Sequence, residues 1–280
     1  MVNPAEGVAS AHQFVSPVTL VTWNLWWRFG DFHTRQEPIA HVLADANADI
    51  VCLQEVWAKQ DHRDQAAWLG ERLGMNVARH DTAQRDGLSF ANAVLSKWPI
   101  VKSESHALPG TDARPSHRQV IHAEIQSPRG SIHVFSTHLD QRFDNSELRQ
   151  KQLKVICALM ARVERNPETD FPMILAGDLN AVPDSDEIRT LTGRRPPFVP
   201  GLVMTDTWEV VGRSDPGWTW RGDNPLLVEA QWPNRRLDYV MTSWPRRSGH
   251  GTPVAAQLIG ATPIDGVMAS DHAGLRVTLR

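Results

Sequence analysis

Polar side chains stand at or beside the ends of several apolar, strand-like runs, and their types are those that bind cations or transfer protons. The run Val18–Asn24 ends in an amide, and the run Ile50–Glu55 ends in a carboxylate. The other side chains of this kind are His138, Asp178, Asn180, Asp238, Asp271 and His272. If the strands share one edge of a sheet, we expect all of these side chains to converge in a single cleft.

Each residue has an ordinary structural explanation when it is taken alone. Asn24 is typical of a turn, Glu55 of a charged strand end, and Asp178 of an Asx turn or a helix cap. His138 is typical of a hydrogen-bonded core histidine. The adjacent pair Asp271–His272 is less ordinary, because a carboxylate and an imidazole beside a strand often serve metal or acid–base chemistry. It is the whole set, in one chain order, that indicates an active site.

The composition is that of a globular protein. The chain has 280 residues, of which 41% are apolar and 22% charged, and this excludes wholesale disorder. No apolar run approaches the roughly 20 residues that span a bilayer. The first residues, MVNPAEGVASAHQF, have neither the basic start nor the apolar core of a secretory signal, so we expect a cytoplasmic protein. The two cysteines, Cys52 and Cys157, lie in apolar segments and are expected to be buried free thiols.

The elements that must position the polar residues are read from hydrophobic periodicity. Helices are expected at Glu37–Ala48, Gln65–Leu73 and Ser146–Glu164, with Gly74 ending the second and Arg149 on the solvent face of the third. Strands are expected at Val18–Asn24, Ile50–Glu55, Ala91–Ser96, Val120–Ile125, Ser131–His138, Pro172–Gly177, Leu237–Thr242 and Gly274–Leu279. Because strands and helices do not alternate strictly, mixed or antiparallel sheets are favoured. Residues 1–16 are expected to be a loose lead-in to a single domain over 17–280.

Six short motifs carry a family resemblance. They are TWN at 22–24, LQEV at 53–56, THLD at 137–140, GDLN at 177–180, LDYV at 237–240 and SDH at 270–272. In this order they resemble the endonuclease/exonuclease/phosphatase superfamily, in the branch of DNase I-like nucleases and neutral sphingomyelinases. The resemblance spans nearly the whole chain. It implies a four-layer α/β sandwich, in which two mixed, mostly antiparallel sheets pack face to face and are flanked by helices.

The resemblance also implies a divalent-metal-dependent hydrolase of phosphoesters. Glu55 would be the main ligand of Mg²⁺, with Mn²⁺ as a possible substitute, and Asn24 and Asp271 would lie close to the ion. A hard cation with oxygen ligands suits this chemistry, because the substrate is an anion that repels nucleophiles. Arg118 and Asn224 are candidate contacts to the substrate phosphate, although Arg118 could equally be an ordinary surface arginine.

Five residues would act on the phosphate itself, again by resemblance. Asp178 would orient or deprotonate the attacking water, and Asn180 would hold the phosphate or that carboxylate. His272 would face the phosphate as a charged donor, with Asp238 fixing its ring and raising its basicity. His138 would supply a second imidazole near the attacking or leaving oxygen.

The substrate is less well defined by the sequence. We expect a cytoplasmic, monomeric, nuclease-like phosphodiesterase that acts on nucleic acid in preference to lipid. The alternatives are a sphingomyelinase-like phospholipid phosphodiesterase, a small phosphoester phosphatase, and a non-catalytic phosphate-binding module on the same fold. The last is disfavoured because Glu55, Asp178 and His272 are all present. The sphingomyelinase is disfavoured because no long apolar hairpin for membrane insertion is found.

Aromatic and basic residues near the motifs leave two further questions open. Trp26, Trp27, Trp218 and Trp220 lie in segments expected to border the cleft, where they could stack on bases, meet lipid, or pack beneath long loops. The pair Arg235–Arg236 directly precedes the Asp238 motif and could meet a polyanion, or it could be solvated surface charge.

Overall fold

The computed structural model describes residues 16–59, 64–111, 116–163, 170–212, 214–227, 233–244 and 249–280. The expected lead-in over 1–16 therefore lies, apart from Ser16, outside the described residues. In chain order the elements are β1 (Val18–Asn24), α1 (Gln36–Ala46), β2 (Ile50–Lys59), α2 (Gln65–Leu73), β3 (Asn76–Arg85), β4 (Leu88–Ser96), β5 (Ile100–Ala107), β6 (Gln119–Ser127), β7 (Gly130–His138), α3 (Ser146–Met160), β8 (Ile174–Asp178), α4 (Asp186–Leu191), β9 (Met204–Asp206), α5 (Thr207–Val211), the 3₁₀ turn η1 (Pro225–Leu227), β10 (Asp238–Ser243), β11 (Pro253–Ile259) and β12 (Gly274–Leu279).

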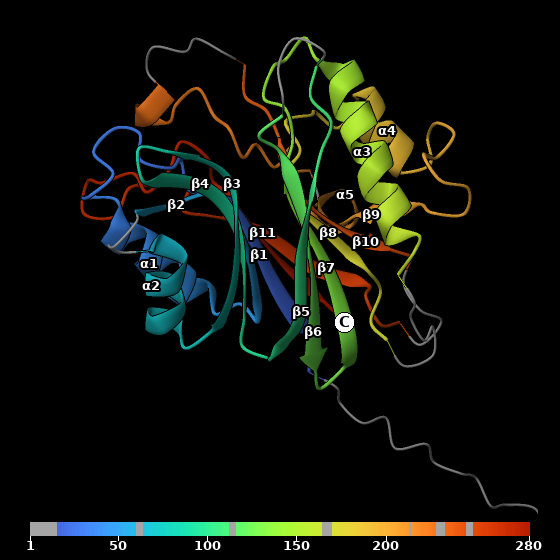
Figure 1. Cartoon of the computed structure of the whole chain (residues 1–280), viewed down its shortest axis with the longest axis horizontal. Coiled ribbons are helices and arrows are strands. Elements are labelled where there is room, and N and C mark those ends of the chain that lie inside the picture. The colour runs from blue at the N-terminus through green and yellow to red at the C-terminus, as the bar shows by residue number, and fades with distance from the viewer. Residues whose placement is uncertain are drawn as a thin grey trace, which may run out of the picture.

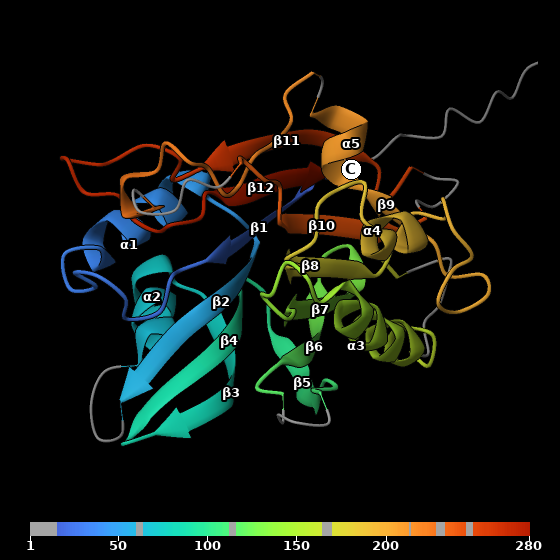
Figure 2. The ribbon, with the colours of Figure 1, turned by 90° about the horizontal axis from the view of Figure 1, so that it is seen from above.

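The strands form two six-stranded sheets that pack face to face. Their orders are β11-β12-β1-β2-β4-β3 and β5-β6-β7-β8-β10-β9. Each sheet holds one parallel pair, β1 with β2 and β7 with β8, and its other pairs are antiparallel. Helices α1 and α2 lie outside the first sheet, and α3 and α4 lie outside the second (Figures 1 and 2). The expected sandwich of mixed sheets flanked by helices is confirmed.

Three apolar clusters fill the spaces between these layers, and they explain why the central strands are apolar throughout. Side chains alternate between the two faces of a strand. In β1, Leu20 therefore packs between the sheets, whereas Val21 packs beneath α1 and α2. A third cluster, which includes Phe135 and Leu153, joins the second sheet to α3. Because both faces of the inner strands are covered, these strands read as continuous apolar runs.

The sequence missed four strands, and all four are the outermost strands of their sheets: β11, β3, β5 and β9. An outermost strand pairs on one side only, and much of β5 and β11 is also exposed to solvent. Its sequence need not be apolar, as IVKSESHA in β5 shows. The short helices α4 and α5 were also missed. The inner strands and the first three helices were predicted within a few residues, and the bounds of α2, of β1 and of β12 were predicted correctly.

The sequence was wrong about Arg149, which is buried on α3 and does not face solvent. Its Nε donates to Glu187 Oε1 of α4 at 2.7 Å, and Ser146 Oγ donates to the other oxygen of the same carboxylate at 2.8 Å. Periodicity assigns a charged residue to the surface because it cannot show a buried partner some forty residues away.

Both cysteines are buried and free, as expected. Among the described helices, none has the length and apolar character to cross a membrane.

Candidate active site

Strand register brings three of the predicted residues into one row at an edge of the second sheet. Asp178 ends β8 and is paired with His138 at the end of the parallel strand β7. On its other side it is paired with Asp238, which begins the antiparallel strand β10. The end of one strand and the beginning of its antiparallel neighbour lie at the same sheet edge. The three side chains therefore point into one space, and all three are buried.

Gly177 makes this close row possible. Its φ of +144° belongs to backbone that side chains rarely adopt, and a Cβ at this position would lie 1.9 Å from the carbonyl oxygen of Thr137. Only glycine therefore allows β8 to approach β7 so closely at the residue before Asp178.

The first sheet contributes the facing residues. Asn24 ends β1, and Asp271 and His272 lie just before β12, the antiparallel neighbour of β1. Glu55 lies where the register of β2 against β4 shifts between Leu53 and Val56. Its φ is +56°, so the backbone is left-handed at this bulge. The strand does not end at Glu55, as the sequence suggested, but continues beyond the bulge to Lys59, and the bulge turns the carboxylate toward the site.

His272 and Asp238 form the tightest pair of the site. They are 34 positions apart in the chain, and His272 Nδ1 lies 2.8 Å from Asp238 Oδ2. Burial by itself would lower the pKa of His272, but the carboxylates of Asp238, Asp271 and Asp178 outweigh it and hold the pKa well above the ordinary value. The second ring nitrogen, Nε2, points toward Asp178 Oδ2 at 3.8 Å.

His138 lies on the other side of Asp178 and has the opposite character. Its Nδ1 accepts from Arg118 Nη1 at 2.9 Å, which places the ring proton on Nε2, 3.5 Å from Asp178 Oδ2. Burial, together with the charges of Arg118 and His272, lowers the pKa of His138 well below its ordinary value. His138 is therefore neutral at pH 7. Arg118 binds this imidazole and Gln141, so it holds His138 in place beside the site.

Asp178 is held at its carboxylate by two neighbours. The backbone N–H of Asn180 donates to Oδ1 at 2.9 Å, and Asn24 Nδ2 donates to Oδ2 at 3.1 Å. Burial and the nearby charge of Asp238 raise the pKa of Asp178 to about 6. The side chain of Asn180 donates instead to the carbonyl of Leu139. Asn180 lies in a left-handed turn after the strand and holds the carboxylate through its backbone N–H.

Glu55 and Asp271 could hold a divalent cation. The Oε2 atom of Glu55 is buried and accepts no hydrogen bond from a described residue. Burial raises the pKa of Glu55, and the charge of Asp178 adds to the effect. Burial, with the charge of Glu55 adding to it, raises the pKa of Asp271 to about 7. A cation would satisfy the unpaired oxygen and relieve the repulsion. The residues present therefore fit a hard, oxygen-liganded ion.

Two observations modify the predicted ligand set. As placed, Asn24 presents its amide nitrogen to Glu55 Oε1 at 3.2 Å, while its oxygen accepts from the backbone N–H of Trp26. Among the described residues, the one group of three whose ligand atoms lie within 4.8 Å of one another is Asp178, Asp238 and His272. The ring of His272 lies between the two carboxylates of this group, and in its protonated form it supplies positive charge there.

Asn224 holds a loop beside the site, and its expected contact with the substrate phosphate stays a prediction. Its Nδ2 donates at 3.0 Å to the carbonyls of Ser270 and Asp271, and its oxygen accepts from Leu226 N. These contacts use both N–H groups of the amide. They set the position of the segment that carries Asp271 and His272.

Sequence reasoning missed two residues that hold the site together. Thr219 Oγ1 accepts from the backbone N–H groups of Leu237 and Asp238, and its carbonyl accepts from Ala273 N, so it joins the start of β10 to the start of β12. Arg35 is buried and donates to the carbonyls of Leu25 and Ala269, both at 2.8 Å. Neither has a sequence signal, because each acts through backbone groups that are distant in the chain.

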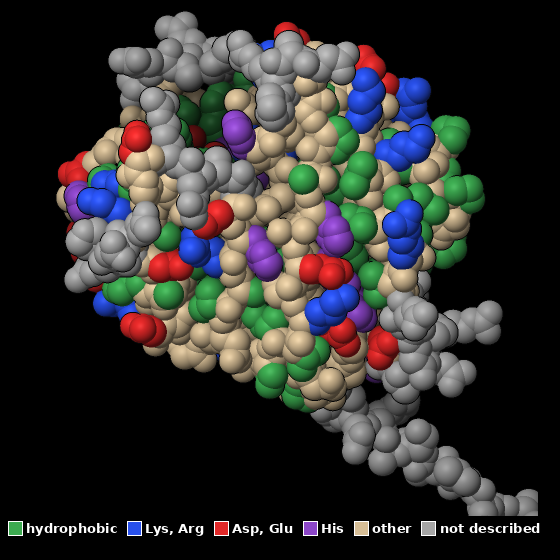
Figure 3. Space-filling model, in the orientation of Figure 1, with side chains coloured by type: hydrophobic (Ala, Val, Ile, Leu, Met, Phe, Trp, Pro, Cys, Tyr) green, Lys and Arg blue, Asp and Glu red, His purple; other side chains and the backbone are tan. Residues whose placement is uncertain are grey.

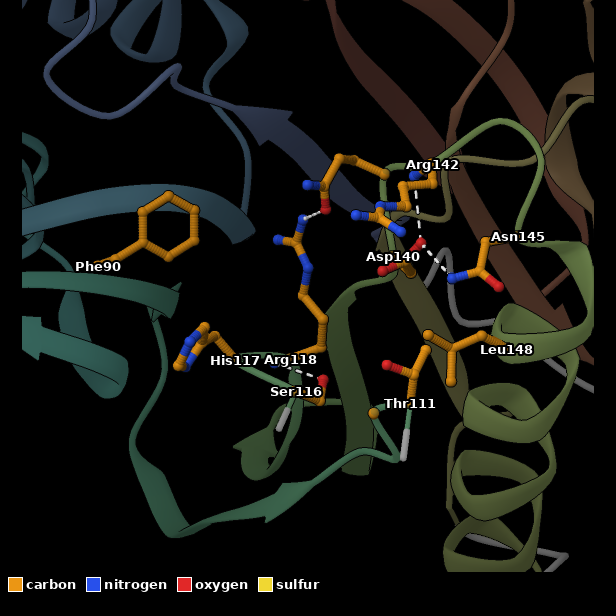
Figure 4. Close-up of a pocket in the computed structure, with 11 residues that line it drawn as sticks. Phe90, Thr111, Ser116, His117, Arg118, Asp140, Arg142, Asn145 and Leu148 are labelled. Carbon is orange, nitrogen blue, oxygen red and sulfur yellow. Dashed lines mark hydrogen bonds between the residues drawn. The ribbon is translucent and has the colours of Figure 1, made fainter. Parts of the chain in front are cut away.

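A pocket of about 340 Å³ opens beside His138. Figure 4 shows Phe90 of β4 on one side of it and Asp140, Arg142 and Asn145, from the segment between β7 and α3, on the other. Arg118 extends between the two sides. The pocket thus joins both sheets at the edge where the row of His138, Asp178 and Asp238 lies.

The pair Arg235–Arg236 is not a free basic patch. Arg236 is buried, and its Nη1 donates to Asp206 Oδ2 at 2.7 Å. Arg235 lies over the ring of Phe143, 4.2 Å from the centroid, and Phe143 in turn contacts Trp220. The idea that both arginines meet a polyanion is therefore wrong for Arg236, because the buried carboxylate of Asp206 already pairs with it.

Comparisons with known proteins agree with this arrangement. The model of the Endonuclease/Exonuclease/phosphatase family matches residues 21–272. A "Putative neutral sphingomyelinase" of Drosophila melanogaster is 29% identical over 62% of this chain and 41% of its own length. "Tyrosyl-DNA phosphodiesterase 2" of Gallus gallus is 28% identical over 93% of this chain and 66% of its own length. The chain thus spans between about two fifths and two thirds of these relatives.

Solved structures show the same fold. The tyrosyl-DNA phosphodiesterase 2 of D. rerio, in complex with a single-strand DNA product, superimposes with a TM-score of 0.73 at 21% identity, and the match covers 95% of this chain and all of the other. An endonuclease/exonuclease/phosphatase from Beutenbergia cavernae superimposes with a TM-score of 0.69 at 23% identity, over 95% of this chain and 72% of that one.

Proposed function

The chain belongs to the endonuclease/exonuclease/phosphatase family, and we propose that it is a metal-dependent phosphodiesterase whose substrate is nucleic acid. The observation that carries the proposal is the position of Asp178 between two imidazoles of different protonation. Its Oδ2 lies 3.5 Å from Nε2 of the neutral His138 and 3.8 Å from Nε2 of the protonated His272. A base, a neutral imidazole and a charged donor thus lie together around one carboxylate oxygen.

These three groups meet the needs of phosphodiester hydrolysis. A base must take a proton from water, and its pKa should lie near the working pH, as that of Asp178 does at about 6. The protonated His272 donates to a phosphoryl oxygen, where negative charge builds up in the transition state. Asp238 keeps this ring charged and oriented. His138, held by Arg118, donates its Nε2 proton toward the attacking or the leaving oxygen.

A divalent cation bound by Glu55 and Asp271 would neutralise charge on the phosphoryl oxygens. We propose Mg²⁺ as the ion, with Mn²⁺ as a substitute, because the donors are hard carboxylate oxygens. A monomeric state and a cytoplasmic location stay predictions from the sequence.

The extent of the matches favours nucleic acid as the substrate. The relative named as a DNA phosphodiesterase aligns with 93% of the chain, whereas the one named as a sphingomyelinase aligns with 62%. The second match keeps a phospholipid phosphodiester as the other candidate substrate.

The experiment is a substrate panel with the purified chain in Mg²⁺ or Mn²⁺. The panel contains plasmid DNA, single-stranded DNA and RNA, an oligonucleotide with a 5′-phosphotyrosyl end, sphingomyelin vesicles and an aryl phosphodiester. We expect turnover of at least one nucleic-acid substrate. Turnover of sphingomyelin alone would replace nucleic acid by lipid, and no metal-dependent turnover of any member would refute hydrolysis altogether.

Glu55→Gln tests the cation site. Loss of the unpaired buried carboxylate oxygen should remove the metal dependence together with most of the activity, on the order of several kcal/mol of barrier reduction. The matched control is Glu104→Gln, which changes an exposed carboxylate on β5 and should leave turnover unchanged. Near-normal turnover of Glu55→Gln with the same Mg²⁺ requirement would show that Glu55 is not the ligand.

A further inference from the structure

Aromatic rings form a continuous series from the molecular surface to the candidate active site. Phe29 and Trp27, in the segment between β1 and α1, have ring centroids 5.6 Å apart. Trp27 lies 6.1 Å from Phe90, and Phe90 lies 6.3 Å from the imidazole of His138. All three distances are those of favourable ring contacts. We call Phe29, Trp27 and Phe90 the aromatic track.

The backbone that carries the track is strained. Trp26 and Trp27 have φ values of +58° and +36°, and two consecutive left-handed residues with bulky side chains are costly. Such a conformation persists only where the surroundings impose it. Backbone strain of this kind is concentrated at binding and catalytic segments.

Arg35 imposes the conformation. Its Nη2 donates at 3.1 Å to the carbonyls of Trp26, Trp27 and Phe29. Its Nη1 binds Leu25 O and Ala269 O, and the latter lies two residues before Asp271. Burial lowers the pKa of Arg35 to about 10, so the guanidinium stays charged at neutral pH. The segment that carries Trp27 and Phe29 is thus held in one position relative to the candidate cation site. A ligand that stacks on these rings therefore does not have to order the segment when it binds.

Packing alone does not account for the track. Phe29, at its outer end, is 47% exposed, although the rings next to it are partly buried. At the inner end, Phe90 lines the pocket beside His138 (Figure 4). The ring of Trp27 is fixed by its Nε1, which donates to Ser89 O at 2.9 Å. An exposed ring, a fixed ring and a pocket-lining ring therefore lead directly to the reacting groups.

The net charge of the chain does not attract a polyanion. The chain has a net charge of −3, and basic and acidic side chains are interspersed on the face seen in Figure 3. Stacking of bases on aromatic side chains is the other general source of affinity for single-stranded nucleic acid, and it does not depend on base sequence.

We infer that Trp27 and Phe29 bind an unpaired nucleobase of the substrate, next to the nucleotide whose phosphate is hydrolysed. This inference rests on the proposed nucleic-acid substrate. Trp27 and Phe29 contribute to binding, and the phosphate chemistry remains with the residues around Asp178.

The test compares two single-stranded oligonucleotides with the same phosphates, one with bases and one abasic around the scissile phosphate. Binding is measured by fluorescence anisotropy on the full chain carrying Glu55→Gln, so that neither strand is cleaved. We expect the strand with bases to bind roughly fivefold to a hundredfold more tightly, since one stacked base contributes that much. Adding Phe29→Ala or Trp27→Leu should remove most of this difference while leaving the affinity for the abasic strand unchanged.

Trp244→Ala is the matched control, because Trp244 is 70% exposed and follows the end of β10 opposite to Asp238. It should keep the full difference between the strands. Phe29→Ala changes an exposed side chain, so its circular dichroism should match the parent even if Trp27→Leu misfolds. Equal binding of both strands by the parent, or an undiminished difference in Phe29→Ala, would overturn the inference.

The outcomes separate this inference from the proposed function. If the unmodified chain cleaves nucleic acid but binds the two oligonucleotides with equal affinity, the inference about the aromatic track is wrong and the proposed function is unaffected. If no nucleic acid is bound or cleaved, and Phe29→Ala instead weakens binding to sphingomyelin vesicles, the occupant is a lipid and both proposals are wrong.

Discussion

Two histidine–carboxylate pairs, one that joins the two sheets and one within the second sheet, behave in opposite ways. At the candidate active site, His272 Nδ1 lies 2.8 Å from Asp238, and its pKa is held well above the ordinary value. On β5 and β6, His122 Nδ1 lies 3.3 Å from Glu104 Oε1, and the pKa of His122 is lowered. Both imidazoles are buried, so burial disfavours the charged ring in each case.

The difference lies in the carboxylates. His272 is surrounded by Asp238, Asp271 and Asp178, which are all buried and act at full strength in a medium of low dielectric constant. Glu104 has a side chain that is 38% exposed, so water screens its charge. His122 also contacts a second imidazole, that of His133, and stacks on Phe135. A histidine beside a carboxylate is therefore not by itself a charged catalytic pair.

The comparison is tested most strongly by Asp238→Asn. This change removes the partner that keeps His272 charged and oriented, so kcat should fall by roughly two to four powers of ten. Without Asp238 the pKa of His272 falls, the protonated form is lost at lower pH, and the optimum of the kcat–pH profile should move toward acid. If the variant keeps the wild-type profile, Asp238 is only a charge at a strand end.

His272→Ala sharpens the same side of the comparison. Since the imidazole and Asp238 act as one unit, the single change should lower kcat about as much as the double variant His272→Ala/Asp238→Asn. Steady-state kinetics on the four proteins of this cycle measure the coupling. Additive losses would mean that the two residues act separately.

A titration followed by NMR on ¹³C-labelled histidine measures the two rings directly. His272 should titrate above 6.5 and His122 below it. Single variants, His272→Ala and His122→Gln, assign the signals. A His122 that titrates above His272 would contradict the role assigned to burial of the carboxylates.

Because the pKa of His122 is lowered in the folded protein, the free energy of unfolding should decrease as the pH falls. The unfolded chain binds a proton near pH 6.5 that folded His122 binds only at lower pH. The contribution is therefore present above pH 6.5 and is lost as the pH falls toward the folded pKa. Urea unfolding at several pH values should show that His122→Gln loses less stability than the wild type on acidification. An identical loss in both proteins would place the titrating group elsewhere.

Glu104→Gln should have the smallest effect. An exposed carboxylate contributes little through its ion pairs, so the free energy of unfolding should change by no more than about 0.5 kcal/mol. Activity should not change, since the histidines near Glu104 are not those of the site. A loss of activity comparable to that of Asp238→Asn would mean that His122 and Glu104 contribute to catalysis.

The sequence by itself determined the central strands, and its family resemblance predicted the sandwich; the roles of the site residues stay predictions. Strands covered on both faces must be apolar along their whole length, so β1 and β12 could be bounded from residue types alone. The polar residues at the ends of these runs were expected to converge if the strands shared a sheet edge, and the strand register places His138, Asp178 and Asp238 in one row. The end of α2 was also predicted correctly from the sequence, because Gly74 ends the helix in the left-handed conformation.

Only the tertiary structure decided the outermost strands, the supporting residues and the protonation states. Strands such as β5 are exposed and need no apolar pattern, so their pairing is imposed by a neighbour and not by their own residues. Arg149 was predicted as a surface charge and Arg35 had no sequence signal, yet both are buried with partners that come from distant segments. The charge of His272 and the neutrality of His138 likewise depend on how deeply the surrounding groups are buried, and burial is a property of the assembled chain.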